Sequence, residues 1–201
     1  MKLSIGLMLG ALLIGNVAAQ QVNPDVLVKS VTNDVLDIVS KDQDIQNGNA
    51  AKAIALVEAK VLPDFDFKRM TALALGKDWR KATPDQQMAL TAEFRTLLVR
   101  TYSRALTSYK NQSIDFKPTK LAGDETDVTV RTEIRQPGTQ SVSIDYAMEK
   151  SGATWKVYDI TVSGISLVMS FRDQFGQQVL NGGIDGLIKT LHTKNDARAK
   201  A

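Results

Sequence analysis

The residue types that most often carry catalysis are scarce in this chain. There is a single histidine, His192, and cysteine is absent. A general base needs an oriented partner and a nucleophile within reach, whereas His192 lies near the end of the last expected helix, where a cationic surface residue is favoured. Without cysteine, disulfides and thiol chemistry are excluded, and a zinc site would need carboxylates almost alone. We therefore expect no metal ion and no cofactor.

Two pairs of carboxylates and one glycine-rich stretch are the other candidates for chemistry. Asp64 with Asp66, and Asp124 with Asp127, lie in polar turns, where acidic residues commonly serve capping and solubility. Residues 181–186 follow an expected helix instead of a strand, which favours a break between helices over a phosphate-binding loop. No GxSxG or Walker motif occurs. We expect no catalytic residue and no enzymatic activity; a hydrolase of unknown type is an alternative that an esterase screen would test.

Apolar side chains remain as the candidates for binding. They are Val128, Val130, Val142, Ile144, Tyr146 and Met148 in alternating segments, Phe94, Leu98 and Tyr102 in the longest helix, and Ile165, Leu167, Val168, Met169 and Phe171 at the start of the closing helix. The same residue types fill a solid core or form the wall of a cavity. Periodicity alone therefore leaves plain core packing as the alternative to a binding cavity.

The spacing of apolar residues indicates which elements position these side chains. Helical periodicity predicts helices at about 24–40, 50–62, 65–75, 84–110, 166–180 and 184–191, with a turn at 41–49 and a short helical turn at 77–82. Alternation predicts four strands joined by short turns, at about 114–116, 128–134, 142–148 and 155–162. In the last strand the phase changes, so either both faces are covered or a β-bulge is present. These blocks predict an α+β fold: several N-terminal helices, a four-stranded twisted antiparallel sheet and C-terminal helices.

The first 19 of the 201 residues have the features of an export signal. Lys2 precedes an apolar stretch, and Val17-Ala18-Ala19 places small residues where a signal peptidase reads them. We expect cleavage after Ala19, a single domain at 20–194 and a disordered polar tail at 195–201. The 24 basic and 22 acidic residues left after cleavage include no run of four basic residues, which argues against nucleic acid as the main partner.

Several short motifs occur in a fixed order between residues 23 and 194. They are LPDFDF at 62–67, ALGKDWRKATP at 74–84, FRTLLVRTY at 94–102, YDI at 158–160, GISLV at 164–168, FRDQF at 171–175 and GIDGL at 183–187. In order and spacing they resemble the MlaC family of periplasmic phospholipid-binding proteins, also called toluene-tolerance auxiliary components. The segment 88–90 departs from the family, which more often has an aromatic residue there.

The resemblance implies a periplasmic, non-enzymatic phospholipid carrier. In the family, a deep apolar pocket holds the acyl tails and leaves the head group near solvent. The family exchanges lipid with an inner-membrane ABC transporter complex, through its substrate-binding ring protein, and with an outer-membrane lipoprotein–porin complex, which keeps the outer leaflet free of misplaced phospholipid. We expect a monomer with phospholipid as cargo, and lipid contacts from the apolar residues named above together with Leu73, Leu75 and Trp79. The alternative is a periplasmic adaptor subunit of an ABC transporter that packs its core fully and binds no lipid.

Glycines flank the closing helices. Gly164, Gly176, Gly182 and Gly183 could permit a motion that releases the cargo, or could serve only to cap helices. The direction of transport, the number of acyl chains and the head-group preference stay open.

Overall fold

The computed structural model describes residues 22–110, 112–119, 121 and 123–199 and has the expected α+β architecture. The expected signal peptide at 1–19 and its cleavage point lie outside the described residues. None of the helices in these ranges combines the length and the hydropathy needed to cross a bilayer.

Three helices open the described chain. Helix α1 (Pro24–Lys41) starts with proline in its first turn, where the missing N–H costs nothing. Helix α3 (Ala50–Lys60) is capped by Asn49, whose side chain accepts a hydrogen bond from the Lys52 amide at 3.0 Å. Between them, the turn expected at 41–49 contains a single helical turn, α2 (Gln43–Gln46). It forms because the Asp42 carboxylate accepts hydrogen bonds from two of its amides.

Helix α4 (Phe67–Leu75) is flanked by two 3₁₀ segments, η1 (Leu62–Asp64) and η2 (Gly76–Lys81). The helix begins at Asp66, whose carboxylate accepts a hydrogen bond from the Arg69 amide at 2.8 Å. It ends at Gly76, which has a φ of +58° that favours glycine. The expected helix at 65–75 is therefore two residues shorter at its start.

Helix α5 (Pro84–Tyr102) is preceded by a capping box. The side chains of Thr83 and Gln86 each accept a hydrogen bond from the other's backbone amide. The helix expected to reach about residue 110 tightens after Tyr102 into a 3₁₀ segment, η3 (Ser103–Ser108).

The sheet has five antiparallel strands that pair in sequence order. They are β1 (Ser113–Phe116), β2 (Asp127–Arg135), β3 (Val142–Ser151), β4 (Thr154–Val162) and β5 (Ile165–Ser166). The first four are the expected strands. The fifth follows a turn in which Ser163 and Gly164 have positive φ, and its two residues are too few to show an alternation.

A β-bulge accounts for the change of phase in β4. Ala147 lies opposite Asp159, but the next residue, Met148, lies opposite Val157. Tyr158 is therefore the extra residue and has no partner in the register. Of the two expectations for this strand, the bulge is confirmed.

The chain closes with η4 (Met169–Phe171) and the long helix α6 (Arg172–Ala199). Gly183, with φ +67° and ψ −173°, divides α6 into two helices at the expected break. The disordered tail expected from residue 195 is wrong for residues 195–199, which continue α6. Asn195 is buried and donates a hydrogen bond to the Glu93 carbonyl at 2.9 Å, which ties the end of α6 to α5.

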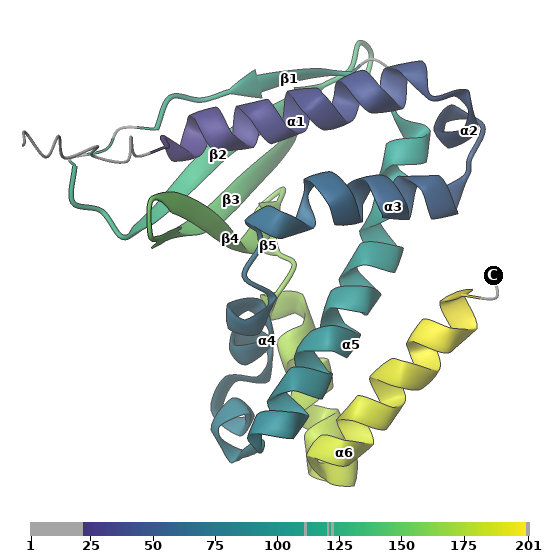
Figure 1. Cartoon of the computed structure of the whole chain (residues 1–201), viewed down its shortest axis with the longest axis vertical. Coiled ribbons are helices and arrows are strands. Elements are labelled where there is room, and N and C mark those ends of the chain that lie inside the picture. Colours follow the sequence, from purple (N-terminus) through teal and green to yellow (C-terminus); the bar gives the residue numbers. More distant parts are fainter. Residues whose placement is uncertain (1–21, 111, 120, 122, 200–201) are drawn as a thin grey trace, which may run out of the picture.

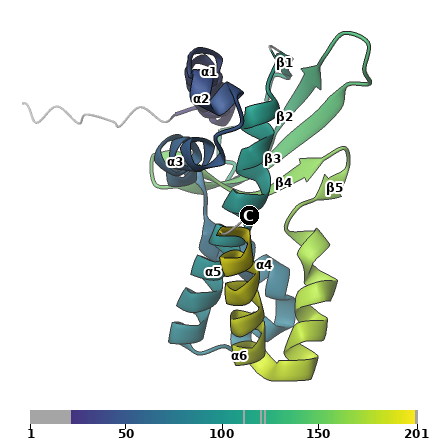
Figure 2. The ribbon, with the colours of Figure 1, turned by 90° about the vertical axis from the view of Figure 1, so that its right-hand side faces the viewer.

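The elements form an upper and a lower part. In Figure 1, α1 and α3 lie beside the sheet in the upper part, while α4, α6 and most of α5 form the lower part. Figure 2 shows the same arrangement from the side, with α1 and α3 on one side and the sheet on the other. Helix α5 rises from the lower part and reaches the space between them, so it belongs to both parts.

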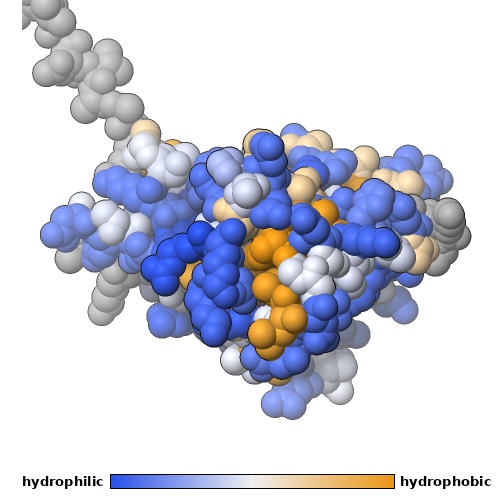
Figure 3. Space-filling model, turned by 90° about the horizontal axis from the view of Figure 1, so that it is seen from below, coloured by the Kyte–Doolittle hydropathy of each residue, from blue (hydrophilic) through white to orange (hydrophobic). Residues whose placement is uncertain are grey.

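The apolar core consists of three clusters instead of one continuous mass. The largest lies among α4, α5 and α6, a second joins α1 to the sheet around Trp155, and a third joins α1, α2 and α3 around Ile45. Outside these clusters, Leu180 of α6 is 78% exposed, and Figure 3 shows a strip of apolar side chains on the lower face. The space where the three clusters meet is the cavity described next.

Candidate functional site

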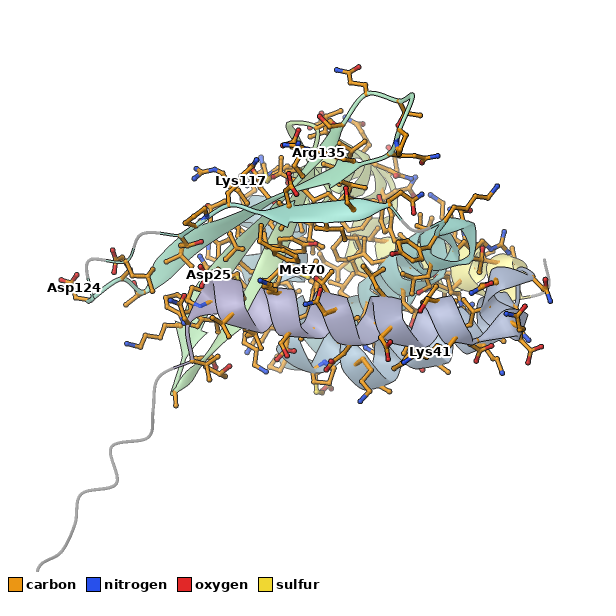
Figure 4. All side chains as sticks on the ribbon, turned by 90° about the horizontal axis from the view of Figure 1, so that it is seen from above. Asp25, Lys41, Met70, Lys117, Asp124 and Arg135 are labelled. Carbon is orange, nitrogen blue, oxygen red and sulfur yellow. The ribbon has the colours of Figure 1, made fainter. Side chains whose placement is uncertain are left out.

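A cavity of about 710 Å³ lies between the sheet and the helices. Residues from all three core clusters form its wall. Val28, Met148 and Val157 belong to the cluster around Trp155, Val35 to the cluster around Ile45, and Met70 and Leu98 to the lower cluster, among α4, α5 and α6. Figure 4, seen from above, shows Met70 of α4 through the gap between α1 and the sheet. The volume is within the range of small-molecule binding sites, about 300–1,000 Å³.

Helix α1 forms one wall through its apolar stripe. Val28, Val31 and Val35 recur at helical spacing and face the cavity together with Leu27 and Leu36. The opposite face of the helix is turned outward, since Val26 is 58% exposed. The apolar face of α1 thus lines the cavity and also packs into the two clusters at the ends of the helix.

The sheet forms the opposite wall. Ile144, Tyr146 and Met148 alternate along β3 and share one face, with Ile160 of β4 opposite Tyr146. Val157 and Ile160 are three residues apart, so in a regular strand they would point to opposite faces. The bulge at Tyr158 returns both side chains to the cavity.

Helix α5, with η3, forms the third wall. Leu98, Val99, Tyr102 and Leu106 line the cavity over a little more than two helical turns, and α3 contributes Val57. Tyr102 stands at the edge of the cavity because 41% of its surface is exposed. Burial of the remainder raises the pKa of its hydroxyl, against the opposing influence of the Arg198 charge.

Polar groups are few among the described residues of the cavity wall. Asp64 is the one carboxylate among the lining residues, and its partial burial raises its pKa while the charge of Lys156 opposes the shift. Burial also raises the pKa of Tyr146, whose hydroxyl interacts with Thr132. Within the described ranges, no group of three or more histidine, cysteine or acidic side chains could hold a metal ion.

An ion-pair network holds α4 against the sheet below the cavity. The Arg69 guanidinium lies 3.5 Å from the centre of the Tyr158 ring and pairs with Asp127 at 2.9 Å and with Glu149. Burial raises the pKa of Glu149, while the bond from Arg69 opposes the shift. Nearby, the Asp66 amide donates a hydrogen bond to the Val157 carbonyl at 2.8 Å. These contacts fix the start of α4 and the adjacent cavity wall.

The structure brings together six of the residues expected to contact lipid. The following line the cavity: Leu98, Tyr102, Ile144, Tyr146, Met148 and Leu167. They come from α5, β3 and the turn after β5, which are far apart in sequence. These three regions therefore share one apolar surface, and contact between these six residues and lipid stays a prediction.

The other expected residues lie elsewhere. Leu75, Phe94 and Val168 are buried in the lower cluster, with Leu73, Trp79 and Phe171 packed against it. Phe94 lies one turn before Leu98, and only the last turns of α5 reach the cavity, so its neighbours on the same stripe pack against α6 instead. For these six residues the core-packing alternative describes the structure.

The remaining five occupy the ends and outer parts of the sheet region. Val130 is buried and Val128 half-buried in the cluster beneath the first turns of α1. Val142, Ile165 and Met169 are exposed. Val128, Val130 and Val142 lie in strands that alternation predicted, but alternation could not show which of them face the cavity. Ile165 and Met169 were expected at the start of the closing helix, but they lie in β5 and η4, and the helix expected from residue 166 begins only at Arg172.

Sequence reasoning missed the contributions of α1, α3 and η1. Leu27, Val31, Val57, Val61 and Phe65 line the cavity and were not among the expected lipid contacts. The stripe on α1 was a usable signal, since its spacing identifies a buried face. The partner of that face is the sheet, more than 100 residues later, and no local pattern names it.

Comparison with known proteins places this chain among lipid-binding relatives. The model of the "MlaC protein" family matches residues 29–193. The toluene tolerance protein ttg2D of Pseudomonas putida is 29% identical over 92% of this chain and 84% of its own length. The intermembrane phospholipid transport system binding protein MlaC of Haemophilus influenzae is 24% identical over 91% of this chain and 87% of its own.

A solved structure shares the fold. The phospholipid-binding protein of Ralstonia solanacearum, determined in complex with a phospholipid, has a TM-score of 0.81 and 40% identity, over 89% of this chain and 99% of that one. The family match covers most of the chain, and the fold and cavity agree with it. The chain described here belongs to the MlaC family.

Proposed function

We propose that this protein is a periplasmic carrier that holds the acyl tails of a phospholipid in the cavity and moves the lipid between membranes. The observation that carries the proposal is the cavity itself, an apolar space of about 710 Å³ walled by α1, α5 and the sheet. A fully packed adaptor subunit would have no such space. The phospholipid bound by the Ralstonia protein, which is 40% identical, supports the same cargo here.

The energetics explain why such a carrier is needed. Exposing an acyl chain to water costs about 0.8 kcal/mol for each methylene. Two chains of about 15 methylenes each would cost roughly 20 kcal/mol or more, so unassisted transfer across water is very slow. A carrier only has to replace water by apolar wall along the tails. It needs no acid, base or metal for this, and we propose that the protein is not an enzyme.

The route of transfer follows the family role. We place the carrier between an outer-membrane lipoprotein–porin complex and an inner-membrane ABC transporter complex with its substrate-binding ring protein. The name of the Haemophilus relative, an intermembrane phospholipid transport system binding protein, supports this placement. Residues 1–19 would direct export and then be removed, so the mature protein would begin at Gln20, and it would act as a monomer.

Lipid extraction tests the cargo. The protein is purified without detergent, extracted with organic solvent and analysed by mass spectrometry. About one or more phospholipids per protein is the expected result. A protein that emerges free of lipid, and that takes up none from phospholipid vesicles, would favour the adaptor function.

A further inference from the structure

A second pocket, separate from the cavity, is lined by arginine. It has a volume of about 510 Å³ and lies where the first turns of α3, the end of α5, η3 and the end of α6 come together. We call it the arginine pocket; its lining residues are Ala50, Ala51, Ile54, Arg100, Thr101, Arg104 and Arg198. Figures 1 and 2 show α6 ending close to the point at which α5 passes α3.

Two of the three arginines are held in position by contacts between α5 and α6. The Arg100 guanidinium donates a hydrogen bond to the carbonyl oxygen of Asn195, and that of Arg198 donates to the Thr101 hydroxyl. The Thr101 hydroxyl itself donates to the Leu97 carbonyl at 2.6 Å, so it is fully engaged. The remaining N–H groups of both arginines are available to a ligand because an arginine side chain has five.

Nothing in the lining neutralises this charge. The described residues that line the pocket include no carboxylate, and the Arg104 side chain makes no hydrogen bond or ion pair with any of the described residues. Of the other described arginines, Arg69, Arg95 and Arg135 each pair with an acidic side chain at 3.2 Å or less and Arg131 pairs with Asp145 at 4.0 Å, whereas Arg80 and Arg172 have no ion pair. Three guanidinium groups around one depression, with no acid among them, repel one another unless an anion joins them.

The start of α3 adds to the positive potential. Ala50 and Ala51 are the first two residues of this 11-residue helix, so the positive end of its dipole adjoins the pocket. Their small side chains leave room for a ligand beside the arginines. The arginines define the site, and the positive end of the α3 dipole also favours a negatively charged ligand.

We propose that the arginine pocket binds a phosphate group. Guanidinium groups match phosphate oxygens through paired hydrogen bonds. A single carboxylate has two oxygens and one charge, whereas a phosphate offers more oxygens to three converging arginines. The phosphate can come from the head group of a lipid at a membrane surface or from free phosphate, and the experiment below separates these sources.

The pocket lies next to the rim of the lipid cavity but does not belong to it. Arg100, Thr101 and Arg104 line the pocket, while Tyr102 and Ser103, between them in sequence, line the cavity. The charge of Arg198 also acts on the Tyr102 hydroxyl at the cavity edge. A membrane phosphate bound here would hold the rim of the cavity close to the lipid surface.

Arginine side-chain NMR tests the proposal directly. Inorganic phosphate is titrated into the full mature protein labelled with ¹⁵N, and the Nε–H signals of arginine are followed. We expect the signals of Arg100, Arg104 and Arg198 to shift together. Arg104→Gln should weaken phosphate binding roughly tenfold, the effect of losing one charge-assisted hydrogen bond. Because Arg104 has no partner among the described residues, this variant should fold as the unaltered protein does.

Arg80→Gln is the matched control, since Arg80 is exposed on η2 and outside the pocket. Equal weakening by both variants would show general charge attraction and overturn the site. Vesicles then identify the source: if lipid head groups are bound, Arg104→Gln lowers sedimentation with phosphatidylglycerol vesicles more than Arg80→Gln does. If vesicle binding is unchanged but inorganic phosphate binds, free phosphate is the ligand.

Absence of shifts at the three arginines, together with unchanged vesicle binding in Arg104→Gln, would refute the proposal. This result is distinguishable from failure of the carrier function. The amount of phospholipid that copurifies with Arg104→Gln should equal that of the unaltered protein, because this residue does not line the cavity.

Discussion

Filling the cavity from α1 should expel the cargo without unfolding the protein. Val31 lies on the cavity side of α1, and tryptophan at this position would project into the empty space. The larger side chain adds about seven heavy atoms. At about 0.8 kcal/mol per displaced methylene, the loss of lipid binding energy is at most about 5 kcal/mol. Displacement of only three methylenes would cost about 2.4 kcal/mol, or roughly a 50-fold loss of affinity.

Val26→Trp is the matched control for Val31→Trp. Val26 is on the same helix, is the same residue type and is 58% exposed, so tryptophan there meets solvent instead of cargo. Both variants should have similar midpoints of thermal unfolding. The assay is the amount of phospholipid that copurifies with each variant, followed by competition against a fluorescent phospholipid.

The reasoning is refuted if Val31→Trp carries as much phospholipid as Val26→Trp and binds the fluorescent lipid with the same affinity. Such a result would mean that the acyl tails do not occupy the space between α1 and the sheet. Loss of lipid in both variants would indicate damage to α1 in general and would also contradict the assignment.

Three further substitutions test how the helices are held. Gly183→Ala should lower the free energy of unfolding by about 1–2 kcal/mol in urea, because a φ of +67° is unfavourable for alanine, whereas Gly182→Ala should not. A hinge predicts that replacing both Gly182 and Gly183 slows lipid transfer by more, expressed as a free energy, than it lowers the free energy of unfolding. If the two changes are equal, the glycines are not a hinge. The Glu93 carboxylate raises the pKa of His192, so the stability from this contact should be complete below pH 6.5 and decline as the pH rises through the raised pKa. His192→Gln should remove that part of the pH profile of stability, and an unchanged profile would show that the contact contributes nothing. Arg69→Gln should lower the free energy of unfolding by about 1–2 kcal/mol after allowance for solvent screening, through loss of its ion pairs and ring contact; equality with Arg80→Gln in the same urea experiment would contradict this role.

Local chemistry was sufficient to predict most helix boundaries. Thr83 and Pro84 identify the start of α5, and Gly76 the end of α4, because caps satisfy backbone groups from within a few residues. The break at Gly183 follows from the same kind of local signal. Prediction failed at 195–199, where a polar sequence remains helical. Asn195 is stabilised there by Glu93, a residue 102 positions earlier.

The sheet could be predicted from the sequence only in part. Alternation located β2 and β3 and the side chains that share a face, since the period of two is a property of each strand. The change of phase in β4 was visible, but alternation could not choose between two covered faces and a bulge. The register of β4 against β3 leaves Tyr158 without a partner, which shows that the bulge is present.

By itself, the sequence determined the class of the protein: an α+β chain with enough apolar stripes to enclose hydrocarbon and with motifs of one family. Only the tertiary structure decided which stripes leave a void between them. Leu98 and Phe94 lie one turn apart on the same stripe, yet one faces the cavity and the other packs against Phe175 in solid core. The physical reason is that periodicity records whether a side chain avoids water, whereas a cavity depends on the distance between elements that meet only when the whole chain has folded.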